Sequence, residues 1–118
     1  MARILLAEDD DSLRGFLARA LERAGFEVTA CADGEEAVQH LDTPWDLLLT
    51  DIVMPGMDGI EVARQAAARD PSLRIMFITG FAAVALSAQD RAPAGAKVLS
   101  KPVHLRDLVS EVEKMMAA

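Results

Sequence analysis

Residues 47–59 read LLLTDIVMPGMDG, an apolar run that stops at an acid and gives way to a turn rich in proline and glycine. Such a short, unbroken apolar run is typical of a strand at the centre of a parallel sheet, where both faces are buried. We therefore expect a strand over 46–50, with Asp51 just after it. A merely solvated acid has little reason to follow a buried strand, so Asp51 is a candidate functional residue.

Strands and helices are expected to alternate along the rest of the chain. Short apolar or alternating runs predict strands over 3–7, 26–31, 74–79 and 98–99. Helical spacing predicts helices over 13–24, 34–41 and 105–116, and a helix that begins at 60 and ends near 70. We expect a short helix over 82–88 and a mobile loop over 87–95, which carries a proline and a glycine. Five strands alternating with helices indicate an α/β fold, a doubly wound five-stranded parallel sheet with right-handed crossovers.

The composition bounds the class of protein. The 118 residues suit one domain, expected over 1–118 without an output domain, and 52% of them are hydrophobic. A net charge of -7 without a basic block argues against nucleic-acid binding. The longest nearly apolar stretch, 75–86, is shorter than the roughly 18 residues that span a bilayer, so no membrane insertion is expected. The one cysteine, Cys31, fits a reducing cytoplasm and a small core residue.

Polar side chains are expected to gather at the carboxyl ends of the strands, where folds of this class place their sites. The candidates are Glu8, Asp9, Asp51, Thr79 and Lys101. Clustered carboxylates need a compensating cation, and an oxygen-only set suits Mg²⁺. One carboxylate could then attack a phosphoryl donor, while the ion and the lysine absorb charge on the transferred oxygens.

Each candidate also has an ordinary interpretation. Acids before a helix are often N-caps, and Asp10 or Asp11 fits that role. Lys101 alone would be a surface lysine, and a threonine is common in strands. His40 and His104 fit solvated helix residues. The joint pattern at the strand ends, and not any single member, favours a functional site.

The combined motifs resemble the response-regulator receiver family over essentially the whole chain. The resemblance is carried by ILLAEDD at 4–10, LLTDIVMPGMDG at 48–59, ITG at 78–80 and LSKP at 99–102. It implies a flavodoxin/CheY-like sheet with strand order 2-1-3-4-5 and a cis bond before Pro102. It also implies phosphoryl transfer from a histidine kinase or histidine phosphotransferase, with no enzymatic activity beyond the receiver's own phosphorylation and dephosphorylation.

The same resemblance assigns roles to the residues at the strand ends. Asp51 corresponds to the phosphoacceptor, and Thr79 and Lys101 correspond to the switch hydroxyl and the active-site lysine. The implied Mg²⁺ ligands are Glu8, Asp9, Asp51 and the main-chain carbonyl of Val53.

Three positions depart from the family pattern. Glu8 stands where Asp is commoner, and Val53 replaces an often polar residue, which bears on dephosphorylation. Val98 stands where the family has its switch aromatic, three positions before Lys101. We therefore expect Phe81, two positions after Thr79, to take over part of the signalling, or to contact a partner.

A finer resemblance concerns the output. Residues 75–86, 96–106 and 113–118 are similar to stand-alone cell-cycle receivers of alphaproteobacteria. This implies an adaptor that engages ClpX of the ClpXP protease when unphosphorylated, through a surface formed by the fourth helix, the fifth strand and the last helix. The alternative is a phosphate shuttle or sink in a phosphorelay. The end, 115–118, resembles tails that ClpX recognises, or is simply a frayed helix end.

Overall fold

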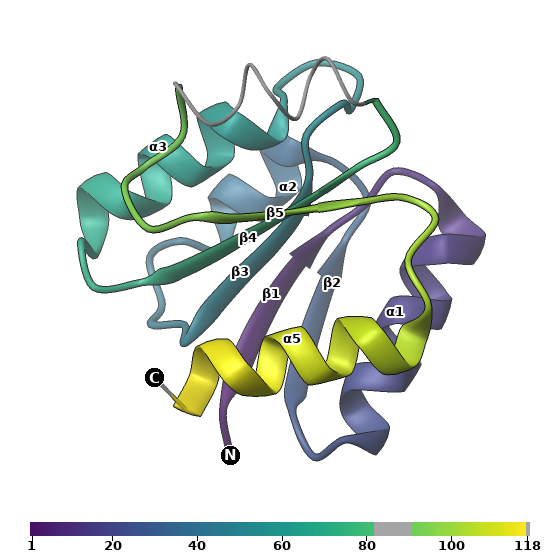
Figure 1. Ribbon diagram of the computed structural model, residues 1–118. Helices are drawn as coiled ribbons and strands as arrows, with labels where there is room; N and C mark the ends of the chain where they lie inside the picture. Colours follow the sequence, from purple (N-terminus) through teal and green to yellow (C-terminus); the bar gives the residue numbers. More distant parts are fainter. Residues whose placement is uncertain (82–90, 118) are drawn as a thin grey trace.

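The computed structural model describes residues 1–81 and 91–117 of the chain. The five strands form one parallel sheet in the order β2-β1-β3-β4-β5, which confirms the expected topology (Figure 1). The expected fourth helix over 82–88 and the first part of the expected loop, 87–90, lie outside the described residues. The elements are β1 (Arg3–Ala7), α1 (Asp11–Arg23), β2 (Glu27–Cys31), α2 (Gly34–Gln39), β3 (Leu47–Asp51), α3 (Gly59–Arg69), β4 (Arg74–Thr79), β5 (Lys97–Ser100) and α5 (Leu105–Ala117).

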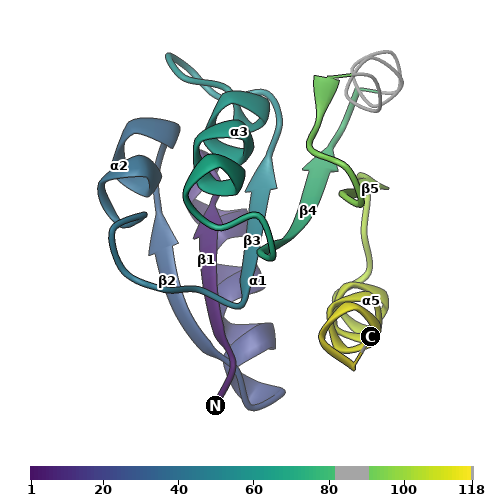
Figure 2. The same cartoon turned by 90° about the vertical axis from the view of Figure 1, so that its left-hand side faces the viewer.

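Helices cover both faces of the sheet, and each face has its own hydrophobic core. Helices α2 and α3 lie on one face, while α1 and α5 lie on the other (Figure 2). Because β3 is buried along its whole length, it can belong to both cores. Leu48 faces the α2/α3 core, and its neighbours Leu47 and Leu49 face the α1/α5 core. The unbroken apolar run of β3 therefore forms a strand at the centre of the sheet, as its sequence predicts.

Aspartates begin three of the helices. Asp10, Asp33 and Asp58 are the N-caps of α1, α2 and α3, and each side chain accepts a hydrogen bond from the backbone N–H three residues later. This arrangement satisfies donors that the first helical turn leaves unpaired. Asp11 is the first residue of α1 and pairs with Arg14 at 2.6 Å. Of the two acids considered for capping α1, Asp10 is therefore the cap.

Several element boundaries differ from the expected ones by one or two residues. Strand β2 begins after Phe26, because the Phe26 N–H closes the end of α1 by bonding to the Leu21 carbonyl at 3.1 Å. Gly25 makes this closure possible with a φ of 99°. Strand β3 is shifted forward by one residue and includes Asp51.

No helix among the described residues is long and apolar enough to cross a membrane.

Candidate functional site

The carboxyl ends of four strands supply the polar residues of the candidate site. Glu8 follows β1, Asp51 ends β3, Thr79 ends β4, and Lys101 follows β5. Strand β3 lies between β1 and β4 in the sheet, so Asp51 is at the centre of this edge. Glu8, Asp51 and Thr79 are all buried, with exposed fractions of 1%, 6% and 1%.

Lys101 joins the two buried acids. Its Nζ lies 2.7 Å from Asp51 Oδ2 and 3.2 Å from Glu8 Oε1, within hydrogen-bond range of both. Its backbone N–H donates to the Thr79 carbonyl at 2.7 Å, which fixes the start of the segment after β5. The following Lys101–Pro102 peptide bond is cis. One lysine thus neutralises part of a cluster that would otherwise hold only negative charge.

Burial shapes the electrostatics of the cluster. Burial raises the pKa of Glu8 to about 7, and the nearby charge of Asp51 makes a smaller contribution in the same direction. The hydrogen bond from the Asp10 N–H and the charge of Lys101 act against this rise. Burial disfavours the charge on Lys101, but its hydrogen bond to Asp51 and the charges of both acids raise its pKa above the usual value. The pocket therefore favours positive charge among its carboxylates.

The turn after β3 holds Asp51 in place. The Val53 N–H donates to Asp51 Oδ1 at 3.2 Å, and the Gly59 N–H donates to the Ile52 carbonyl at 2.8 Å. A Cβ on Gly59 would lie only 1.9 Å from the Asp51 carbonyl oxygen. Glycine is therefore required where α3 passes close behind the aspartate.

Arg14 supports the acidic edge from α1. Its Nη1 donates to the Glu8 carbonyl at 2.9 Å, while its Nη2 pairs with Asp11. The Asp10 N–H also donates to Glu8 Oε2 at 3.0 Å. The sequence reasoning missed Arg14; a basic residue one turn into the helix that follows an acidic loop was the available signal.

Three acids fit a hard divalent cation. Glu8, Asp9 and Asp51 each offer a carboxylate oxygen, and these atoms lie within 4.8 Å of one another. Asp9 is exposed, so the cluster opens to solvent on one side. Oxygen-only donors with an open side suit Mg²⁺, which keeps several waters. In the structure Val53 contributes its N–H to Asp51, and the expected role of its carbonyl stays a prediction.

Thr79 links the acidic edge to Phe81. Its Oγ1 accepts a hydrogen bond from the Phe81 N–H at 3.2 Å. The Phe81 side chain is 58% exposed. Val98 is half-buried, pairs with Phe77 across the sheet and packs against the α2/α3 core. Phe81, unlike Val98, therefore has a side chain free to meet a partner.

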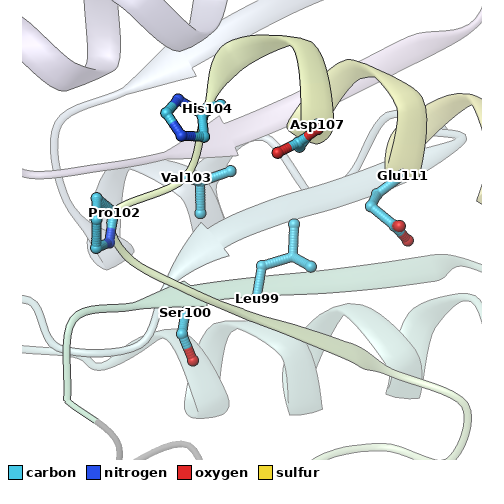
Figure 3. A pocket seen from close by; sticks show the side chains of 7 residues that line it. All are labelled: Leu99, Ser100, Pro102, Val103, His104, Asp107 and Glu111. Atoms are coloured by element: carbon cyan, nitrogen blue, oxygen red, sulfur yellow. The ribbon is translucent and has the colours of Figure 1, made fainter.

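A groove of about 330 Å³ lies between β5 and the start of α5. Figure 3 shows Leu99 pointing from β5 towards α5, and Asp107 and Glu111 projecting from the helix over the groove. Glu111 pairs with Lys97 at 3.1 Å. The groove adjoins the acidic edge through Ser100, which precedes Lys101. It is lined by Leu99, Ser100, Pro102, Val103, His104, Asp107 and Glu111.

The fold and the acidic edge define a known class of signalling domain. The family model of the response regulator receiver domain matches residues 4–113, and the chain belongs to this family. It is therefore a regulatory receiver domain of two-component signalling.

Individual proteins and solved structures are similar to this chain over nearly its whole length. The chain is 63% identical over 119 residues to the response regulator receiver protein CpdR of Brucella abortus (strain 2308), covering 100% of this chain and 99% of the relative. A response regulator receiver protein from Sinorhizobium medicae WSM419 superposes with a TM-score of 0.92 at 33% identity, covering 99% and 95% of the two chains. TrrA from Thermotoga maritima, solved in complex with Mg²⁺ and BeF, superposes with a TM-score of 0.84 at 29% identity, covering 98% and 99%.

The structure also brings together residues that the sequence left apart. Cys31, Glu36 and His40 form a second group with ligand atoms within 4.8 Å of one another. Cys31 is a buried core residue, as expected, but His40 is half-buried instead of fully solvated. The spacing of four residues between Glu36 and His40 was the available signal, since such residues share a helix face.

Proposed function

We propose that Asp51 accepts a phosphoryl group from a histidine kinase or a histidine phosphotransferase, and that this modification gates the binding of a protein partner. The observation that carries the proposal is the buried position of Asp51 at the centre of the acidic edge, 2.7 Å from Lys101 Nζ. Membership of the receiver family supports it. The related TrrA was solved in complex with Mg²⁺ and BeF, which supports a divalent ion at the acidic edge of this chain.

The residues divide the chemistry among them. An Asp51 carboxylate oxygen attacks phosphorus, the nitrogen–phosphorus bond of the donor histidine breaks, and the released imidazole takes up a proton. Glu8, Asp9, Asp51 and the Val53 carbonyl would hold Mg²⁺, which supplies positive charge against the transferred phosphoryl oxygens. Lys101 already lies beside Asp51 Oδ2 and pairs with one of those oxygens. The Thr79 hydroxyl donates to another.

The contact between Thr79 and Phe81 suggests how the signal leaves the site. When Thr79 turns its hydroxyl towards a phosphoryl group, Oγ1 moves away from the Phe81 N–H that it contacts at 3.2 Å. The exposed Phe81 ring then shifts with its backbone. This gives the charge at Asp51 a route to the surface without an aromatic at Val98.

A phosphorylation assay tests the acceptor. With Mg²⁺ and a small phosphoryl donor such as phosphoramidate, the protein gains one phosphoryl group, detected by intact mass and by retarded migration on a phosphate-affinity gel. Asp51→Asn abolishes the gain, and the exposed control Asp42→Asn leaves it intact. Modification that persists in Asp51→Asn would refute the assignment.

We further propose that the protein acts in the cytoplasm and serves as an adaptor of the ClpXP protease. The unphosphorylated form engages ClpX, and phosphorylation ends that contact. The 63% identity to CpdR and the resemblance of residues 75–86 and 96–106 to cell-cycle receivers support this proposal. The groove between β5 and α5 and the Phe81 ring offer contact surface beside the acidic edge.

Calorimetric titration against the isolated ClpX N-terminal domain tests the adaptor role. Binding is expected for the bare protein and is expected to disappear with Mg²⁺ and beryllofluoride. Phe81→Ala should weaken the bare complex or abolish its dependence on the mimic, whereas Thr79→Val should abolish only the dependence. If neither state binds, with or without a delivered substrate, the alternative of a phosphate shuttle or sink in a phosphorelay takes the place of the adaptor.

A further inference from the structure

A second cluster of metal-ligating side chains lies where β2 passes into α2. Cys31 ends β2, and Glu36 and His40 lie in the first turn and at the C-cap of α2. Each residue offers one ligand atom, and the three atoms lie within 4.8 Å of one another. Among the described residues, this is the one such group besides the acidic edge.

The local fold explains why the three side chains converge. Asp33 caps α2 by accepting from the Glu36 N–H at 2.8 Å, which starts the helix directly after the strand. Glu36 and His40 are four residues apart and therefore share one side of the helix. The Ala32 N–H donates to Glu36 Oε2 at 2.9 Å, so the carboxylate is held towards the end of β2, where Cys31 lies. A carboxylate has two oxygens, and this bond does not prevent coordination.

His40 is held as firmly as Glu36. Its backbone carbonyl accepts a hydrogen bond from Trp45 Nε1 at 2.8 Å, and its ring meets the Trp45 ring edge-on with centroids 6.4 Å apart. Trp45 is itself buried and lies under the guanidinium of Arg3 at 4.4 Å. The imidazole is thus held in place before an ion binds, which lowers the entropic cost of binding.

The donor set selects the kind of cation. A thiolate sulfur, a carboxylate oxygen and an imidazole nitrogen suit borderline cations such as Zn²⁺ and Co²⁺, whereas Mg²⁺ and Ca²⁺ prefer oxygen alone. We propose that Cys31, Glu36 and His40 form a site for a transition-metal cation of the Zn²⁺ class, with water completing the coordination. Cys31 is fully buried, and the half-exposed Glu36 and His40 form the solvent side through which the ion enters.

Charge balance agrees with this assignment. Burial, and then the negative charges of Glu36 and Asp33, disfavour a thiolate at Cys31 in the ion-free protein, and Arg14 opposes them only in part. A bound dication compensates these negative groups. On binding, the sulfur–hydrogen bond of Cys31 breaks, its proton passes to solvent, and the sulfur electron pair forms the bond to the metal. No redox change is involved.

Cobalt titration tests the site in the intact protein. Co²⁺ bound to a thiolate gives a charge-transfer absorption in the near ultraviolet, and the chain has one cysteine, so the band reports on Cys31 alone. We expect one ion per chain, displacement by Zn²⁺, and persistence of the band in excess Mg²⁺, which occupies the oxygen-only edge. Cys31→Ser abolishes the band.

Matched variants identify the other two ligands. His40→Gln and Glu36→Gln should each weaken Co²⁺ binding by about tenfold or more, with folding checked by circular dichroism. His104→Gln is the control, because His104 is the second of the two histidines and is exposed at the start of α5. Absence of the band, saturation at half an ion per chain, or unchanged affinity in His40→Gln would overturn the site. None of these outcomes depends on phosphorylation of Asp51.

Discussion

Glu8 has a buried carboxyl group whose pKa is raised to about 7 by loss of solvent and by the charge of Asp51. The ordinary value of 4.5 applies to the unfolded chain, so the folded protein binds the extra proton more tightly between these two pH values. In the absence of divalent ions, ionising Glu8 therefore reduces the free energy of unfolding as pH rises from about 4.5 towards and through 7. The full loss, above this window, reaches up to about 3 kcal/mol.

Chemical unfolding in EDTA across this pH range measures the effect. The glutamine in Glu8→Gln has no proton to lose. The free energy of unfolding of this variant should therefore increase relative to that of the wild type as pH rises. The control is Glu113→Gln, an exposed acid on α5. A constant difference between wild type and Glu8→Gln at all pH values would contradict the prediction.

Gly59 and Gly15 give opposite predictions for the same substitution. In Gly59→Ala the new Cβ would lie 1.9 Å from the Asp51 carbonyl oxygen, a backbone atom that cannot move aside cheaply. We expect a loss of about 2–3 kcal/mol in the free energy of unfolding. In Gly15→Ala the nearest atom is 3.5 Å away and belongs to the flexible end of Arg19. There the better helix former should stabilise α1 by about 0.5–1 kcal/mol.

Denaturant titration of both glycine variants, with the denaturant dependence compared, gives the measurement. Equal effects of the two substitutions would mean that helix propensity alone governs Gly59. The close approach of α3 to the Asp51 backbone would then have no energetic weight.

At the scale of elements, the last residue of β2, Cys31, is shielded from solvent and from thiol reagents. Cys31 is fully buried, and burial together with Glu36 and Asp33 raises the pKa of its thiol to about 12. The reactive species is the thiolate, so the folded protein in EDTA should react with a thiol reagent at about pH 8 orders of magnitude more slowly than the urea-unfolded chain. Labelling followed by mass spectrometry checks this. Equal rates in the two states would show that the β2–α2 junction opens freely.

The sequence predicts the elements well where a single pattern controls them. The leucines of β3 and the inner stripe of α5 follow from hydrophobic spacing alone. The start of β2 does not, because the Phe26 N–H is drawn back to Leu21 by a hydrogen bond that depends on the helix end. The boundary between two elements depends on contacts that both elements make. Hydrophobic periodicity describes each element separately, so it does not predict such a boundary.

The sequence also predicts only part of the candidate site. The strand-end positions of Asp51 and Thr79 follow from the topology of a parallel sheet, and the structure finds both there. The double contact of Lys101 depends on the direction of a long side chain, which spacing does not encode. The convergence of Cys31 with Glu36 and His40 was missed for a similar reason, since it requires the angle between β2 and α2.

For the molecule as a whole, the order of the strands predicts a gradient of local stability. Strands β3 and β4 are paired on both sides and buried over nearly all their length, while β5 lies at the edge with exposed ends. Native-state hydrogen exchange should therefore show Leu48 and Leu49 exchanging only through global unfolding, and Val98 and Leu99 through local opening. Denaturant dependence of the exchange rates separates the two routes. Equal dependence in β3 and β5 would contradict the gradient.

The double contact of Lys101 has a consequence for ion affinity. The ammonium group is a competitor that the chain itself supplies, tethered at a high effective concentration beside the carboxylates that an incoming cation would bind. A dication that bound these acids would compete with a charge that cannot diffuse away. We therefore expect Lys101 to lower the affinity of the acidic edge for a dication. Without a dication, the ammonium group still compensates part of the negative charge of the acidic edge.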